Sequence, residues 1–215
     1  MGMANMIYRS HPWHGLSLGP LMPQIVNCYI EIVPTDTIKY ELDKETGILK
    51  VDRPQKYSSV CPSLYGLLPK TYCGHHLASY CMQKTGLKNI QGDGDPLDIC
   101  VFTEKVIPRG DIILKAIPIG GFRLIDGNEA DDKIIAVMAD DLVYGSLQNI
   151  DECPQRLIER LRHYFLTYKD FPEKTTGTVQ ITHLYDVKEA HQVIELALQD
   201  YEDKYGSTSK PENFW

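Results

Sequence analysis

The stretch DGDPLDICVF, residues 93–102, is the point from which the fold of this chain can be worked out. It places Asp93, Asp95 and Asp98 within six residues, directly before an apolar run. A glycine and a proline separate the aspartates, so a tight turn leading into a strand is expected here. Three carboxylates this close repel one another, and a hard cation such as Mg²⁺ would neutralise them. An acidic, solvated turn before a strand explains the same residues equally well.

A second acidic cluster, DGNEADDK at residues 126–133, precedes another apolar strand at residues 134–138. If the two strands are neighbours in one sheet, both turns face one cleft and supply oxygen ligands for more than one divalent ion. A flexible acidic loop is the simpler interpretation of this cluster taken alone.

Basic residues accompany the acids between Glu31 and Arg53. Lys39 and Glu41 share one face of a strand with a period of two residues, and Arg53 ends the next strand. Cations set among carboxylates suit an anionic, phosphate-containing substrate. Ordinary cross-strand charge pairing would account for Lys39 and Glu41 without any ligand.

The pattern of apolar residues predicts a small barrel followed by helices. Strands are expected at residues 25–32, 38–41, 48–53, 98–102, 112–119 and 133–138. One helix is expected after Pro154, with Leu157, Leu161, Phe165 and Tyr168 along one stripe, and another over residues 190–201. Both helices should cover the barrel.

The composition favours one globular domain over residues 1–215. A hydrophobic content of 43% in 215 residues is enough for one substantial core. The net charge of −7, with no long basic run, argues against nucleic acid as a partner. No signal peptide and no membrane-spanning run are found, so a cytoplasmic location is expected, with the six cysteines as reduced thiols. Residues 1–24 are expected to form an N-terminal extension and residues 206–215 a flexible tail.

Several blocks in this order resemble the soluble, Mg²⁺-dependent inorganic pyrophosphatases of the first structural type. The blocks are IEI, IKYELDKETG, VDR, LYG, DGDPLDIC, ADDK and the triplet Tyr168-Lys169-Asp170. The resemblance implies a mainly β fold, with a five-stranded, OB-fold-like closed barrel and helices packed outside. It also implies hydrolysis of pyrophosphate to two phosphates by a metal-activated water. A metal-dependent phosphatase for another phosphate ester or anhydride is the alternative.

The resemblance assigns roles to residues of this sequence. The implied ligands of Mg²⁺, several ions to a site with Mn²⁺ or Zn²⁺ as substitutes, are Asp93, Asp98, Asp131, Asp126 and Glu31. Asp98 resembles the carboxylate that bridges two ions, and Asp95 resembles the general base. The groups similar to those that hold phosphoryl oxygens are Lys39, Arg53, Tyr65, Lys133, Tyr168 and Lys169. Glu41 resembles a supporting acid near the cleft. Taken alone, Tyr65 reads as a loop residue, either a buried aromatic cap or a phosphate contact.

Residues 67–92 are longer than the compact connection expected at this place, and they are interpreted as an inserted loop near the active site. Cys73, His75, His76 and Cys81 fall in this segment. They could bind Zn²⁺ in tetrahedral geometry, but the paired spacing of structural zinc sites is missing. Bacterial members of the resembled family imply a homo-hexamer, and an altered surface here makes a dimer the alternative.

A calcium-binding EF-hand loop is excluded as an explanation of the acidic motif. Asp93, Asp95 and Glu104 occupy the first, third and twelfth places of such a loop. Leu97 and Asp98 stand at the fifth and sixth places, where an oxygen ligand and a glycine are required.

Overall fold

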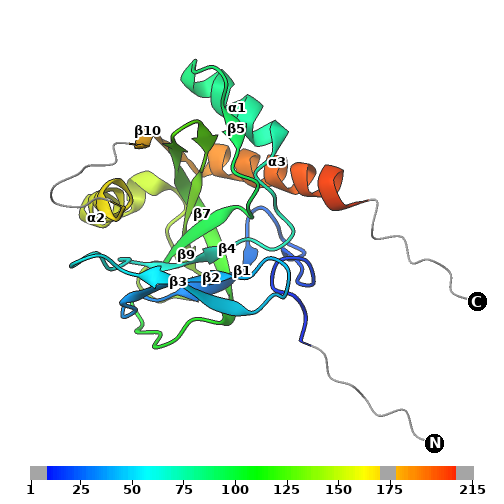
Figure 1. Ribbon diagram of the computed structural model, residues 1–215. Helices are drawn as coiled ribbons and strands as arrows, with labels where there is room; N and C mark the ends of the chain where they lie inside the picture. Colours follow the sequence, from blue (N-terminus) through cyan, green and yellow to red (C-terminus); the bar gives the residue numbers. More distant parts are fainter. Residues whose placement is uncertain (1–8, 170–177, 207–215) are drawn as a thin grey trace, which may run out of the picture.

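The computed structural model describes residues 9–169 and 178–206, and in them strands form the centre while helices lie outside (Figure 1). Each strand of the central group pairs with the next, and the last returns to the first, so that five strands close a ring. In ring order these are β1 (Val26–Ile32), β4 (Leu64–Leu67), β6 (Asp98–Phe102), β9 (Lys133–Met138) and β7 (Ile112–Asp126). The prediction of a mainly β fold with helices packed outside is confirmed.

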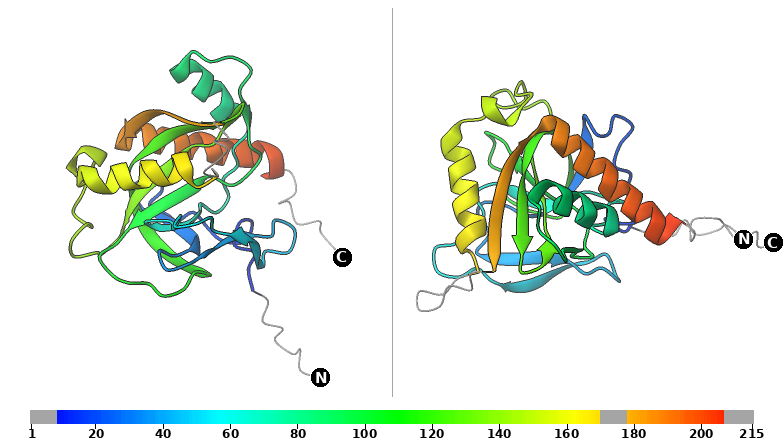
Figure 2. Two further views of the ribbon diagram at one scale, coloured as in Figure 1. Left: turned by 60° about the vertical axis from the view of Figure 1, so that its left-hand side comes forward. Right: turned by 90° about the horizontal axis from the view of Figure 1, so that it is seen from above.

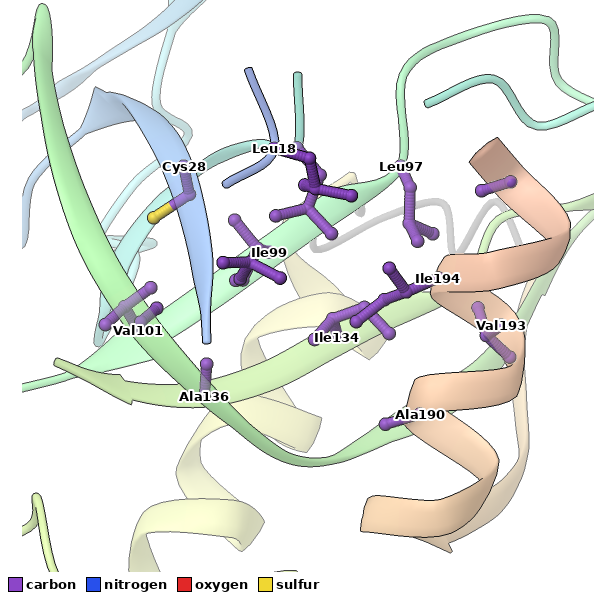
Figure 3. Packing of buried hydrophobic residues seen from close by; sticks show 14 of the residues in the cluster. Leu18, Cys28, Leu97, Ile99, Val101, Ile134, Ala136, Ala190, Val193 and Ile194 are labelled. Atoms are coloured by element: carbon purple, nitrogen blue, oxygen red, sulfur yellow. The ribbon is translucent and has the colours of Figure 1, made fainter. Parts of the chain in front are cut away.

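The neighbouring strands β6 and β9 are buried on both faces, which is why they are continuous apolar runs. Ile99 and Val101 of β6 join one cluster of buried residues, and Cys100 and Phe102 join another on the opposite face. In Figure 3, Ile99 and Ile134 lie between Cys28 of strand β1 and the helix α3 (Val187–Tyr205). The alternation of side chains along β6 therefore places them in two different clusters of the core.

The two predicted helices are present on different sides of the strands (Figure 2). Helix α2 (Gln155–Thr167) follows Pro154 and buries Leu161 and Phe165. Helix α3 begins after Asp186, whose side chain accepts a hydrogen bond from the backbone N–H of Glu189 at 3.0 Å. Ala190, Val193, Ile194 and Ala197 of α3 are buried against the core, and Tyr201 is half-buried. None of the helices in the described part of the chain is long and apolar enough to cross a membrane.

Residues 67–92 differ from the loop expected there. They contain the helix α1 (His75–Thr85) and the short strand β5 (Gln91–Gly92). Asp200 of α3 accepts hydrogen bonds from the backbone N–H groups of Gly74, His76 and Leu77 at 3.0, 2.9 and 3.1 Å. A side chain that is distant along the chain thus caps α1. The N-cap residue Gly74 has no side chain to form this hydrogen bond, so the sequence near the helix carries no capping signal.

The strand β7 is also longer than the predicted strand at residues 112–119. It continues through Gly120 and Gly121 and pairs there with β10 (Val179–Asp186), which was not predicted. A Cβ at Gly121 would lie 2.4 Å from the ring of Tyr185 on β10, so only glycine permits this approach. A glycine pair that looks like the end of a strand is here a place where two strands meet closely.

The remaining elements are short. Strands are present where predicted at β2 (Ile38–Leu42) and β3 (Leu49–Pro54), but they form a separate antiparallel pair instead of joining the barrel as expected. The strand β8 (Glu129–Ala130) pairs with β5 and β7. Tyr65 lies in strand β4 rather than in the expected loop. A 3-10 turn, η1, covers Ile150–Glu152. Residues 1–8 of the predicted extension and 207–215 of the predicted tail lie outside the described residues.

Candidate active site

The two acidic turns meet because β6 and β9 are parallel neighbours. Asp98, the first residue of β6, is paired in register with Lys133, the first residue of β9. The side chain of Lys133 is buried, and its ammonium contacts the carboxylates of Asp98 and Asp131. The predicted common cleft for the two turns is therefore supported by the topology of the sheet.

Negative charge exceeds positive charge at this meeting point. Burial, followed by the nearby charge of Asp98, raises the pKa of Glu31 to about 8. Burial, followed by repulsion from Asp131, also raises the pKa of Asp93. The pKa of Asp98 is raised by burial even though Lys133 opposes the shift. Asp98 and Asp131 thus share the Lys133 ammonium, and the poorly solvated carboxyl groups of Asp93 and Glu31 add to the negative charge around Asp98.

Hydrogen bonds fix two of these acids. The Tyr65 hydroxyl donates to Asp98 Oδ2 at 2.6 Å, and burial raises the pKa of this phenol well above its usual value. The backbone N–H of Leu42, at the end of β2, donates to Glu31 Oε1 at 2.6 Å. Glu31 therefore ties the β2–β3 hairpin to β1.

The hairpin carries the basic side of the site. Lys39 Nζ lies 3.2 Å from Glu41 Oε2 and 2.8 Å from Asp52 Oδ2. Arg53, paired with Lys39 across the hairpin, donates to Asp52 Oδ2 at 2.6 Å. The predicted sharing of one face by Lys39 and Glu41 is confirmed, and Asp52 is an additional partner.

The C-terminal end of α2 positions the predicted residues Tyr168 and Lys169. Lys169 contacts the carboxylate of Asp126, which ends β7. The guanidinium carbon of Arg53 lies 5.8 Å from the centre of the Tyr168 ring, so this helix end faces the hairpin. Asp170, the last residue of the matching triplet, lies outside the described residues.

A cavity of about 80 Å³ lies among these elements. Six of the predicted site residues line it: Glu31, Lys39, Glu41, Tyr65, Asp95 and Asp98. Trp13 and Lys44 also line it, and Lys44 contacts Asp95. Sequence reasoning missed both: Lys44 stood inside a matching block as an unassigned cation, and nothing near Trp13 indicated where this residue packs. Seven predicted site residues do not line this cavity: Asp93, Asp126, Asp131, Arg53, Lys133, Tyr168 and Lys169. Of these, Lys133 contacts the lining residue Asp98, whereas Lys169 contacts Asp126 and Arg53 contacts Asp52.

The donor set fits a hard divalent cation. Within residues 9–169 and 178–206, no three histidine, cysteine or carboxylate side chains already converge tightly enough to hold an ion. Buried carboxylates in excess of ammonium groups nevertheless provide oxygen ligands and a need for positive charge, which suits Mg²⁺. Cys73 and Cys81 are buried thiols, whereas His76 lies 2.8 Å from Asp203, so the zinc hypothesis gains no support from a shared site.

Comparison with known proteins gives this arrangement a family. The family model described as inorganic pyrophosphatase matches residues 28–202. The chain belongs to the inorganic pyrophosphatase family. The inorganic pyrophosphatase of Chlamydia trachomatis serovar L2 is 57% identical over 196 residues, which cover 89% of this chain and 94% of that relative. The soluble inorganic pyrophosphatase of Oryza sativa subsp. indica is 36% identical over 192 residues, covering 89% and 79% of the two chains.

Solved structures agree. The crystal structure of inorganic pyrophosphatase from Thermus thermophilus matches with a TM-score of 0.75 at 25% identity, covering 90% of this chain and 99% of that one. The enzyme described here is therefore a metal-dependent hydrolase that converts pyrophosphate to phosphate. The resemblance drawn from the sequence motifs is confirmed.

Proposed function

We propose that this pyrophosphatase uses Mg²⁺, with Asp93, Asp98, Asp131, Asp126 and Glu31 as ligands and Asp95 as the general base. The observation that carries the proposal is the pairing of β6 with β9, which brings two acidic turns to one edge around a single buried lysine. When bound, divalent cations neutralise the charge of pyrophosphate and lower the pKa of the attacking water. Mn²⁺ and Zn²⁺ are the substitutes that we propose.

Asp98 is the best placed of these acids to serve two ions. It lies between Lys133 and the Tyr65 hydroxyl, and the charges of Asp93, Asp131 and Glu31 all reach it. Tyr65 and Lys133 both contact its Oδ2 and so orient the carboxylate. A carboxylate that already repels three neighbours gains most when a cation arrives.

Asp95 lies on the open side of the same turn. Its side chain is 41% exposed and lines the cavity, whereas Asp98 is more enclosed, with 21% of its side chain exposed. A carboxylate at the solvent boundary reaches a water and passes the proton on to bulk solvent. We therefore assign proton acceptance to Asp95 and cation binding to its neighbours.

The cations around the cavity meet the charge of the substrate. We propose that Lys39, Arg53, Lys133 and Lys169, with the phenols of Tyr65 and Tyr168, hold the phosphoryl oxygens. Each of these cations now contacts a carboxylate. Phosphoryl oxygens are comparable acceptors, so each cation exchanges one charged partner for another when the substrate binds. Glu41 keeps Lys39 oriented and has a supporting role.

Phosphate release from pyrophosphate tests the assignment of the metal and of the substrate. The purified protein is assayed with Mg²⁺, with Mn²⁺ or Zn²⁺, and with a chelator, and the same assay is run on ATP and a simple phosphomonoester. Rapid release from pyrophosphate that the chelator abolishes and Mg²⁺ restores is expected. Activity that survives the chelator would overturn the metal assignment. Equal release from the phosphomonoester would favour the more general phosphatase.

We also propose that the enzyme is a cytoplasmic homo-oligomer, with a hexamer favoured and a dimer as the alternative. All six cysteines are free thiols, which suits a reducing compartment. The exposed residues Val106, Leu142 and Val143 lie on two loops that Asp141 ties together, and such an apolar surface suits a subunit contact. Sedimentation equilibrium gives the number of subunits, and a monomer at working concentration would contradict the proposal. Cell fractionation tests the location.

A further inference from the structure

The contact between Lys44 and Asp95 has no role in the assignment given above. We propose that Lys44 is a positioning residue that holds the Asp95 carboxylate for proton transfer, and that the N-terminal segment around His11 and Trp13 keeps Lys44 in place. The inference rests on the proposed role of Asp95 as general base. It concerns how that base is oriented rather than whether it is used.

The backbone of Asp95 is fixed by hydrogen bonds, but these leave the orientation of its side chain open. Its N–H donates to Asp93 Oδ1 at 2.9 Å, and its carbonyl accepts from the N–H of Cys73 at 2.8 Å. Lys44 Nζ contacts Oδ1 of the Asp95 side chain. With Oδ1 held by the ammonium, Oδ2 is the oxygen that can accept a proton from a water.

Lys44 lies in the tight turn that connects β2 to β3. The N–H of Gly47 donates to the carbonyl of Asp43 at 2.8 Å, and Asp43 Oδ1 accepts from the N–H of Thr46 at 2.9 Å and from its hydroxyl at 2.8 Å. Gly47 has a φ of +70°, a left-handed conformation that glycine adopts without strain. The turn therefore presents Lys44 in one defined place.

His11 of the N-terminal segment packs against this turn. His11 Nε2 lies 3.2 Å from the carbonyl oxygen of Lys44, within hydrogen-bond distance. A Cβ at Gly47 would lie 2.7 Å from Cδ2 of the His11 ring, so the ring packs directly against the turn. The turn cannot move away from Asp95 without disturbing His11.

The same segment also supports the acidic turn. Trp13 is buried, lines the cavity beside Lys44 and Asp95, and donates from Nε1 to the carbonyl of Thr71 at 2.7 Å. The Thr71 hydroxyl accepts from the N–H of Leu97 at 2.9 Å, inside the acidic turn. His11 and Trp13, two residues apart, thus fix the two partners of the Lys44–Asp95 pair relative to each other.

Steady-state kinetics on four variants and the wild type test the role of Lys44. The variants are Lys44→Met, Lys44→Arg, Asp95→Asn and the double variant Lys44→Met with Asp95→Asn. Lys50→Met is the matched control, because Lys50 is in the same hairpin, pairs with Asp43 at 3.3 Å and has 49% of its side chain exposed, against 44% for Lys44. Circular dichroism and thermal unfolding check that every variant is folded.

Lys44→Met should lower kcat about tenfold and leave KM for pyrophosphate within about twofold, because a misdirected base slows the chemistry without weakening binding. Lys44→Arg should recover most of the loss, and Lys50→Met should match the wild type. In the Asp95→Asn background, Lys44→Met should change kcat less than about twofold, because a group that acts only through Asp95 has nothing left to orient.

Four results would contradict the inference or the proposed general base on which it rests. A higher KM with unchanged kcat in Lys44→Met would mean that Lys44 binds the substrate itself. An equal loss in both backgrounds would mean that Lys44 acts independently of Asp95. Normal turnover in Lys44→Met, together with reduced turnover in Asp95→Asn, would exclude Lys44 from the positioning role and leave Asp95 as the general base. Normal turnover in Asp95→Asn would overturn the proposed general base itself.

Discussion

Asp98 and Lys133 occupy paired positions at the start of the parallel strands β6 and β9, and the Lys133 ammonium contacts Asp98 and Asp131 together. The lysine is the shared counter-charge of two acids that come from different turns. Because a parallel pair directs both chains the same way, the residues that precede the two strands necessarily lie at the same edge. The site therefore follows from one strand pairing.

The replacement Asp98→Asn should lower kcat at least about 100-fold, because it removes the charge that two cations would share while keeping the shape of the side chain. The amide oxygen of the introduced asparagine can still accept the Tyr65 hydrogen bond, so the fold should survive. Initial rates with pyrophosphate and Mg²⁺, beside far-ultraviolet circular dichroism, measure both effects. Asp186→Asn is the control, because asparagine caps a helix as well as aspartate does. Retention of most of the activity would exclude Asp98 from the bridging role.

Removal of the shared ammonium should destabilise the enzyme mainly when cations are absent. Burial opposes the charge on Lys133, but Asp131 and Asp98 outweigh it, so the pKa of Lys133 is raised. Lys133→Met should lower the free energy of unfolding by about 3 kcal/mol in a chelator, because it leaves buried carboxylates without a partner. Added Mg²⁺ should reduce this loss, since a bound cation supplies the missing charge.

Urea denaturation with and without Mg²⁺ measures the effect of Lys133→Met. Lys50→Met serves as the exposed counterpart and should cost less than about 1 kcal/mol in either condition. An identical loss with and without Mg²⁺ would contradict the idea that lysine and cation neutralise the same acids.

Arg123 holds a second buried charge network, away from the cavity. Its side chain is 1% exposed, its Nε lies 3.0 Å from Asp132 Oδ1, and it reaches Glu189 of α3 at 3.2 Å. Its guanidinium carbon lies 5.0 Å from the centre of the Tyr80 ring on α1. Arg123→Met should cost at least about 3 kcal/mol of unfolding free energy, because Asp132 is then buried without its partner.

A double-variant cycle tests this account of Arg123. Adding Asp132→Asn to Arg123→Met should recover part of the loss, because it removes the unpaired charge. Arg156→Met, which alters an ion pair whose arginine side chain is 92% exposed, is the control and should change stability by less than about 1 kcal/mol. A double variant no more stable than Arg123→Met would show that lost packing, not charge, is responsible.

Asp141 should make stability depend on pH in the acid range. Its carboxylate accepts hydrogen bonds from the Thr103 hydroxyl at 2.7 Å and from three backbone N–H groups at 2.9 Å each. Burial works against ionisation, but these hydrogen bonds outweigh it and lower the pKa of Asp141 to about 2. A depressed pKa stabilises the fold above the unfolded value near 3.8, and the stabilisation is lost as the pH falls toward 2.

Asp141→Asn should therefore cost about 2 kcal/mol at pH 7, because the amide nitrogen cannot accept the hydrogen bond from the Glu104 N–H. The difference from the wild type should shrink between pH 4 and pH 3. Urea denaturation at a series of pH values follows it. Asp36→Asn is the control, since the hydrogen bond from the Val33 N–H can pass to the amide oxygen. A difference that stays constant over this pH range would refute the role of the charge.

Much of the fold could be predicted because its signals are local. The apolar runs of β6 and β9, the alternation in β2 and the stripe of α2 appear in the sequence at the period of the element that forms. Turn residues between the aspartates placed the first acidic cluster at the start of a strand. The motifs around it identified the family and the class of reaction.

What the sequence by itself could not determine depends on partners that are distant along the chain. Adjacent Asp131 and Asp132 are chemically alike, yet in the structure Asp131 contacts Lys133 and Asp132 binds Arg123 on the other side. Helix α1 depends on Asp200, and Lys44 depends on His11 and Asp95. Periodicity and turn chemistry depend on residues that are close along the chain. The helix cap, counter-charges and supporting contacts named here form only when folding brings separate segments together.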